Sequence, residues 1–135
     1  MRPETDAAPP HVHCPILIVE DDEDLREMMA QLLALEGFKA ETAANGREAL
    51  AYLAQGDRPD VILLDLMMPV MDGWEFRRHQ VTDPALAAVP VVVLSALEPA
   101  RAEALQGVAF LKKPLDFDRL LELVRGFLQS DGLLT

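Results

Sequence analysis

Five polar side chains stand close behind apolar runs of the sequence, where those runs end. They are Glu20, Asp21, Asp65, Ser95 and Lys113. Three carboxylates that meet in one pocket repel each other and raise one another's pKa unless a cation neutralises them, and Mg²⁺, which prefers oxygen ligands, does so. A lysine adds a compact positive charge, and a serine adds a hydroxyl donor. Such a set can make a carboxylate nucleophilic toward phosphorus and then hold the phosphoryl product, mainly by positioning and charge neutralisation.

Each of these residues has a simpler explanation when it is taken alone. An aspartate such as Asp65 after an apolar strand commonly caps a helix, and a serine such as Ser95 often does the same. The acidic segment 20–24 can be a solvated helix start that complements the helix dipole, and Lys113 can be an ordinary surface lysine. Their joint placement at the ends of four predicted strands favours a shared site instead.

The elements that position these residues are apolar strands that alternate with amphipathic helices. Continuous apolar runs predict strands at 16–19, 61–64, 89–94 and 108–111, and a weak alternation predicts one more at 38–42. Residues typical of helix ends mark the helices between them. They are Gly37 at the end of the first helix, Asn45 with Glu48 as a capping box, Trp74 near the start of the third helix, and Asp116 as the cap of the last helix. A further short helix is predicted over 98–106.

This alternation predicts an α/β fold, with one doubly wound, five-stranded parallel sheet and helices on both faces. In such sheets ligands bind beyond the carboxyl ends of the strands. Because the five polar side chains follow strand ends, we expect them to converge on that edge of the sheet.

Length and composition bound the function. The chain has 135 residues, enough for one domain, and 50% of them are apolar. Twelve Lys and Arg residues stand against 23 Asp and Glu residues, a net charge of −11 that repels nucleic acid and anionic membranes. The single cysteine forms no internal disulfide, and every apolar run is too short to span a bilayer. We therefore expect a cytoplasmic domain that binds neither nucleic acid nor membrane.

The ends of the chain differ from the regular middle. Residues 1–13 are rich in proline and carry no hydrophobic period, so we expect a flexible tail. The segment 11–14 holds two histidines and a cysteine, but three ligands within four residues make a poor metal site, and a tail is the better interpretation. We expect the domain at 14–130 and a second tail at 131–135. The chain is either a whole single-domain protein or part of a longer one.

Four segments together resemble the receiver domain of two-component response regulators. They are the first strand with its acidic pair (16–23), the phosphoacceptor segment (61–73), the hydroxyl position (93–96) and the lysine–proline turn (110–114). The resemblance covers about residues 15–129. It implies a flavodoxin-like sheet with strand order 2-1-3-4-5, and it implies phosphorylation of Asp65 by a histidine kinase or a histidine phosphotransfer protein.

The resemblance also implies a role for each site residue. Asp21 binds Mg²⁺ directly, Glu20 binds it directly or through water, and the backbone carbonyl of Met67 supplies a further ligand beside Asp65. Ser95 donates a hydrogen bond to the phosphoryl group, and Lys113 pairs with it. The alternative lysine is Lys112, but the following proline and the in–out alternation of the strand favour Lys113.

Further expectations concern switching. The resemblance implies a cis peptide bond between Lys113 and Pro114, and it implies that the ring of Phe110 follows Ser95 when the domain switches. Such a protein is a phosphoacceptor that catalyses only its own phosphorylation and dephosphorylation, and it passes the signal to a downstream protein that the sequence does not name.

The sequence also departs from the family pattern. Ser95 and Lys113 are 113 − 95 = 18 residues apart, which shortens the fourth helix and favours a monomer or a weak dimer. Met67 and Leu97 are apolar where relatives often carry polar groups that influence the lifetime of the phosphoryl group. These departures bear on output and lifetime rather than on phosphoacceptance.

Two other classes of protein share part of this pattern. A haloacid-dehalogenase-like phosphatase also uses an aspartate at a strand end, but it needs an acidic residue two positions later, where this chain has Met67. A receiver-like binding module that never accepts phosphate usually lacks one of the acids or the lysine, and this chain keeps them all.

Overall fold

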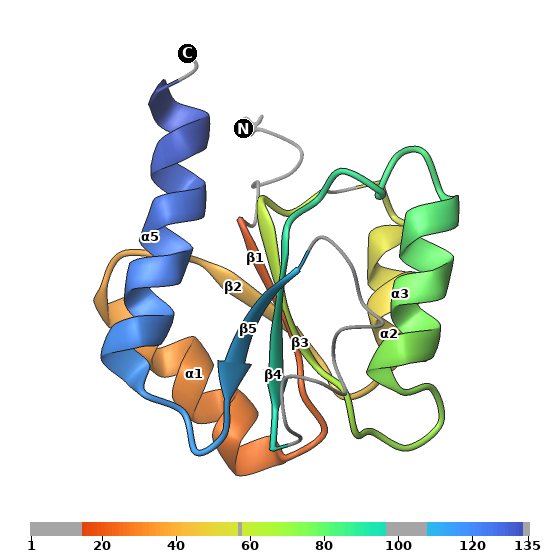
Figure 1. Ribbon diagram of the computed structural model, residues 1–135, viewed down its shortest axis with the longest axis horizontal. Coiled ribbons are helices and arrows are strands. Elements are labelled where there is room, and N and C mark those ends of the chain that lie inside the picture. Colours follow the sequence, from red (N-terminus) through yellow and green to blue (C-terminus); the bar gives the residue numbers. More distant parts are fainter. Residues whose placement is uncertain (1–14, 57, 97–107, 134–135) are drawn as a thin grey trace, which may run out of the picture.

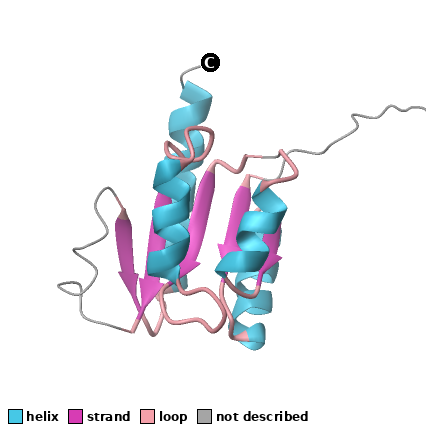
Figure 2. Cartoon of the chain, turned by 90° about the vertical axis from the view of Figure 1, so that its right-hand side faces the viewer, coloured by secondary structure: helices cyan, strands magenta, loops and turns pink. Residues whose placement is uncertain are grey.

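Five parallel strands form one sheet in the order β2-β1-β3-β4-β5, as predicted. The computed structural model describes residues 15–56, 58–96 and 108–133 (Figure 1). All arrowheads in Figure 2 point the same way, so the carboxyl ends of the strands share one edge. The strands are β1 (Ile16–Val19), β2 (Ala40–Ala43), β3 (Val61–Asp65), β4 (Val91–Ser95) and β5 (Ala109–Lys112).

Helices cover both faces of the sheet, which confirms the doubly wound α/β fold (Figure 1). One face carries α1 (Glu23–Leu35) and α5 (Phe117–Leu133), and the other carries α2 (Gly46–Leu53) and α3 (Gly73–Thr82). The expected short helix at 98–106 lies outside the described residues. Helix α5 continues to Leu133, into the segment for which we expected a tail. Within the described residues, no helix has the length and apolar character needed to cross a membrane.

The core consists of two apolar layers, one on each side of the central strands. Ile16 and Ile18 of β1 pack toward the α1–α5 layer, whereas Leu17 and Val19 pack toward the α2–α3 layer. Both faces of β1, β3 and β4 are buried, which explains their unbroken apolar runs.

Two strands begin two residues later than predicted, for local reasons, and the other boundaries differ from the prediction by at most one residue. Strand β2 begins at Ala40 rather than at Phe38, because the Phe38 N–H donates to the carbonyl of Leu33 and so completes the end of α1. Strand β4 begins at Val91 rather than at Val89, because the Val89 N–H donates to the carbonyl of Leu86 in the preceding turn and Pro90 has no N–H to offer.

Short polar side chains start the helices at the carboxyl edge of the sheet. The carboxylates of Asp22 and Asp72 accept the N–H groups of Leu25 and Glu75, at 3.1 and 2.9 Å. Each of the four helices in the described part of the chain follows a strand and begins at this edge. The carboxylate of Asp116 caps α5 as predicted, since it accepts two backbone N–H groups at 3.0 and 3.2 Å.

The capping box predicted for α2 forms only in part. Asn45 accepts the N–H of Glu48 at 2.9 Å, as the prediction requires. The carboxylate of Glu48, however, accepts the N–H of Ala44 at 2.9 Å instead of the N–H of Asn45. Glu48 therefore ties the end of β2 to the first turn of α2.

Gln80 is the buried polar residue that fastens α3 to the loop before β4. Its amide nitrogen donates to the carbonyls of Leu86 and Val89, both at 3.0 Å, and its amide oxygen accepts from Arg77 at 2.8 Å.

Replacing Gln80 with methionine keeps the side-chain volume but removes the amide that donates to these two buried carbonyls. We expect this loss to lower the free energy of unfolding by about 2 kcal/mol. Gln31→Met, at an exposed position of α1, is the matched control and should change stability by less than about 0.5 kcal/mol. Urea unfolding of both variants tests this, and equal effects would contradict it.

Candidate functional site

The polar residues predicted to converge lie at the carboxyl edge of the sheet. Asp65 is the last residue of β3 and stands opposite Leu94, while Ser95 is the last residue of β4 and stands opposite Lys112. Glu20 follows the end of β1, which pairs with β3 through Val19 and Leu64. The parallel register therefore brings four separate parts of the sequence to one place.

Three carboxylates gather at this edge. Glu20 and Asp65 are buried, and Asp21 is exposed. One oxygen from each of Glu20, Asp21 and Asp65 lies within 4.8 Å of the others. This all-oxygen donor set, open to solvent on the Asp21 side, fits the ligand preference of a hard divalent cation such as Mg²⁺, which keeps several of its waters. These residues are the ones that would hold the ion.

Lys113 provides the positive charge of the site. Its ammonium nitrogen lies 2.8 Å from Oε1 of Glu20 and 3.5 Å from Oδ1 of Asp65. The peptide bond between Lys113 and Pro114 is cis, as predicted, and the Lys113 N–H donates to the carbonyl of Ser95 at 2.8 Å. Lys112, the alternative lysine, is exposed. Of the two, Lys113 is therefore the lysine that pairs with both buried carboxylates.

The surroundings shift the proton affinities of two of these groups. The pKa of Asp65 is raised from 3.8 to about 7, chiefly by burial and next by the neighbouring negative charge of Glu20, while the positive charge of Lys113 lowers it in part. Burial by itself would lower the pKa of Lys113, but its hydrogen bond to Glu20 and the two carboxylate charges outweigh burial and raise that pKa. Asp65 thus carries a proton far more readily than an exposed aspartate does.

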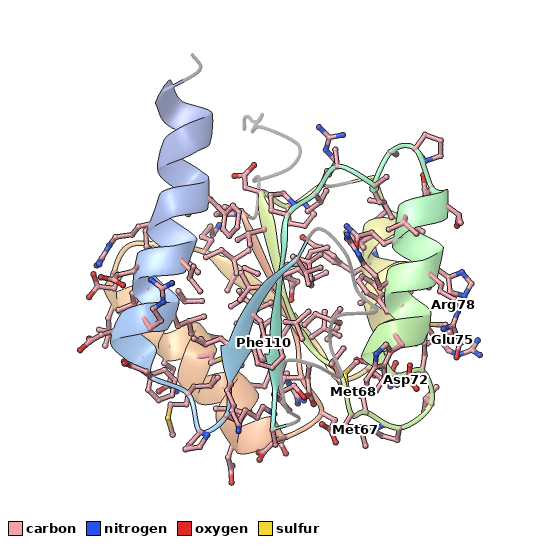
Figure 3. The ribbon with its side chains drawn as sticks, in the orientation of Figure 1. Met67, Met68, Asp72, Glu75, Arg78 and Phe110 are labelled. Carbon is pink, nitrogen blue, oxygen red and sulfur yellow. The ribbon has the colours of Figure 1, made fainter. Side chains whose placement is uncertain are left out.

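The other predicted residues lie just after β3, at the end of β4 and on β5. Ser95 is buried at the end of β4. The Met67 N–H donates to Oδ1 of Asp65 at 3.4 Å, while its side chain points into solvent with 59% of its surface exposed. Phe110, labelled on β5 in Figure 3, is half-buried, and it packs against the apolar cluster of the α2–α3 layer.

The structure also shows supporting residues that the sequence analysis missed. The guanidinium of Arg26 donates to the carbonyl of Glu20 at 2.8 Å, and the N–H of Asp22 donates to Oε2 of Glu20 at 3.1 Å. Nothing in the sequence singles out Arg26, because an arginine in the first turn of a helix is commonly solvated. Gly73, the first residue of α3, lies against the backbone of Asp65.

This combination of a 2-1-3-4-5 parallel sheet, a buried aspartate and a lysine on a cis-proline turn defines a class of doubly wound α/β domain with an acidic site at the carboxyl edge of the sheet. The sequence profile described as "Response regulator receiver domain" matches residues 16–125. The chain belongs to the response regulator receiver domain family. Domains of this family serve two-component systems, and phosphorylation on an aspartate and dependence on Mg²⁺ are general features of the family.

Individual relatives agree with this assignment. Response regulator PleD of Caulobacter vibrioides is 39% identical over 127 residues, which cover 87% of this chain and 28% of PleD. Response regulator MprA of Mycolicibacterium vanbaalenii is 39% identical over 119 residues, 84% of this chain and 50% of MprA. The structure of the chemotaxis response regulator CheY4 of Vibrio cholerae matches with a TM-score of 0.76 at 33% identity, over 86% of this chain and 99% of that one. The chain thus spans between about a quarter and a half of the length of these two curated relatives.

Proposed function

We propose that Asp65 accepts a phosphoryl group from the phosphohistidine of a histidine kinase or a histidine phosphotransfer protein. The observation that carries this proposal is the buried Asp65 carboxylate, within reach of Glu20, Asp21 and the ammonium of Lys113. In the transfer, an oxygen of Asp65 forms a bond to phosphorus as the bond from phosphorus to the donor's imidazole nitrogen breaks. The released imidazole takes up a proton.

Each neighbour has a separate part in this reaction. Glu20, Asp21, Asp65 and the backbone carbonyl of Met67 hold Mg²⁺, whose charge, when the ion is bound, neutralises phosphoryl oxygens. The ammonium of Lys113, which lies 3.5 Å from Oδ1 of Asp65, pairs instead with a phosphoryl oxygen after transfer. It keeps its 2.8 Å contact with Oε1 of Glu20. The Ser95 hydroxyl donates to another phosphoryl oxygen. Positioning and charge neutralisation account for the catalysis, which acts only on the domain's own phosphorylation and dephosphorylation.

Phosphorylation acts as a switch through Ser95 and Phe110. When Ser95 bonds to the phosphoryl group, the ring of Phe110 takes up the space that Ser95 leaves on the neighbouring strand. The phosphoryl group must bind one arrangement more tightly than the other, since only a difference in affinity shifts a population. The switched surface then binds a downstream protein.

The setting of this reaction follows from the same interpretation. The domain, at residues 14–130, works in the cytoplasm as a monomer or a weak dimer, and it contacts neither nucleic acid nor membrane itself. Its net charge of −11 agrees with protein partners rather than with phosphate-rich surfaces. Its partners are the phosphodonor and the downstream target.

The decisive experiment measures the intact mass after incubation with acetyl phosphate and Mg²⁺. The mass should rise by about 80 Da, which is one phosphoryl group. Asp65→Asn should abolish the rise, and Asp118→Asn, at an exposed position of α5, should leave it unchanged. If folded wild-type protein keeps its mass with Mg²⁺ present, the domain is a binding module and not a phosphoacceptor.

A further inference from the structure

The four polar atoms of Glu20 each have a hydrogen-bond partner. Its N–H donates to the carbonyl of Ala43 at 3.0 Å, and its Oε1 and Oε2 accept from Lys113 and Asp22. The fourth atom, the backbone oxygen, accepts from Nη1 of Arg26 at 2.8 Å. Arg26 is thus the side chain that completes the environment of a fully buried acid.

Arg26 reaches this oxygen across the turn that carries Asp21. The backbone N–H of Arg26 donates to the carbonyl of Asp22 at 2.8 Å, in the first turn of α1. Its guanidinium extends back to the carbonyl of Glu20, the residue that follows β1. The turn is therefore closed at both ends, with Asp21 between the two fastened points. Because Asp21 is exposed, side-chain packing does not fix its position. The conformation of the turn therefore keeps its carboxylate near those of Glu20 and Asp65.

We infer that Arg26 is a positioning residue for the Mg²⁺ site, because its bond to the Glu20 carbonyl holds the turn in which the Glu20 and Asp21 oxygens converge toward Asp65. The inference rests on the proposed function for the identity of the ion. Arg26 itself binds neither the ion nor the phosphoryl group. Its contribution is to the affinity for Mg²⁺ rather than to the rate of transfer once the ion is bound.

Charge and positioning make opposite predictions for the loss of Arg26. Removing a positive charge beside an acidic cluster favours the binding of a cation, so a purely electrostatic role predicts tighter Mg²⁺ binding in Arg26→Met. Loss of the hydrogen bond frees the turn and predicts weaker binding. Arg26→Lys keeps the charge and one donor, which makes it the conservative variant for rescue.

The test is a calorimetric Mg²⁺ titration of the full chain, with the rate of phosphorylation by acetyl phosphate followed across the same Mg²⁺ range. We expect Arg26→Met to weaken Mg²⁺ binding about fivefold and to leave the rate at saturating Mg²⁺ within about twofold. Arg26→Lys should recover at least half of the lost affinity. Arg47→Met removes the same charge from an exposed position at the same edge of the sheet and should not weaken binding.

Unchanged or tighter Mg²⁺ binding in folded Arg26→Met overturns the inference, as does an equal loss of affinity in Arg47→Met. A loss of unfolding free energy without a loss of Mg²⁺ affinity assigns Arg26 to stability alone and overturns it too. The titration does not depend on phosphoryl transfer. If the wild type binds Mg²⁺ but takes up no phosphoryl group, the proposed function fails and the inference about Arg26 stands or falls on the titration.

Discussion

Replacing Gly73 with alanine is expected to lower the free energy of unfolding by about 3 kcal/mol and to slow the phosphorylation of Asp65. A Cβ atom at this position would lie 2.5 Å from the carbonyl oxygen of Asp65 and 2.8 Å from Cα of Leu66. Both are backbone atoms of the segment that leaves β3, so they cannot turn aside as a flexible side chain does. The Gly73 N–H also donates to the carbonyl of Leu66 at 2.9 Å, which fixes the start of α3 against this segment.

Gly126 provides the matched control. It lies within α5, and nothing stands within 4 Å of the Cβ that alanine would add there. Gly126→Ala should therefore stabilise the protein by about 0.5–1 kcal/mol, because alanine restricts the unfolded chain and suits a helix interior. Urea unfolding and the rate of the mass increase with acetyl phosphate compare the two variants. If Gly73→Ala and the wild type have the same free energy of unfolding, the backbone at Asp65 and Leu66 can shift to accommodate the added Cβ, and the prediction is wrong.

The strands and their convergence were predictable because each central strand is buried on both faces. That burial demands continuous apolar runs, as in 16–19 and 61–64, and parallel order then carries the residue after each run to one edge. The candidate site followed from this rule without any knowledge of contacts. The weakest strand prediction was β2, where Glu41 and Thr42 are exposed on an edge strand and leave little pattern to detect.

The supporting contacts were not predictable, since they depend on tertiary geometry. An arginine in a first turn is a common solvated residue, and its bond to the Glu20 carbonyl exists only because α1 packs beside β1. The need for glycine at position 73 was not predictable either. Its φ angle is one that any residue adopts, and glycine is required only because the backbone of Asp65 lies so close. Val70, by contrast, adopts a φ of 69°, which the sequence does not signal, because β-branched residues rarely adopt this conformation.

The site brings together more negative charge than Lys113 can balance. Glu20 and Asp65 are buried side by side, and Lys113 divides its ammonium between them at 2.8 and 3.5 Å. Without a divalent cation the protein therefore favours a proton on Asp65, and its pKa rises to about 7. The charges that suit the site for Mg²⁺ consequently destabilise the metal-free fold at neutral and higher pH.

Asp65→Asn is therefore expected to stabilise the metal-free protein at pH 8, even though it abolishes phosphorylation. Between pH 3.8 and about 7 the folded state holds a proton on Asp65 that the unfolded state has lost, so stability falls as the pH rises through this range. A tenfold change in proton affinity corresponds to about 1.4 kcal/mol, and the rise of the pKa from 3.8 to about 7 then corresponds to about 4 kcal/mol. Asparagine keeps the shape and never ionises.

Urea unfolding in the presence of a chelator, at pH 8 and at pH 4, measures the difference between Asp65→Asn and wild type. The gain should approach about 4 kcal/mol at pH 8 and nearly vanish at pH 4, where Asp65 is largely protonated in the folded wild type. Mg²⁺ at pH 8 should stabilise the wild type more than the variant, because the ion neutralises a charge that the variant lacks. Asp118→Asn, on the exposed first turn of α5, should show no gain at either pH. A gain in Asp65→Asn of the same size at both pH values would show that the charge of Asp65 is not its cause.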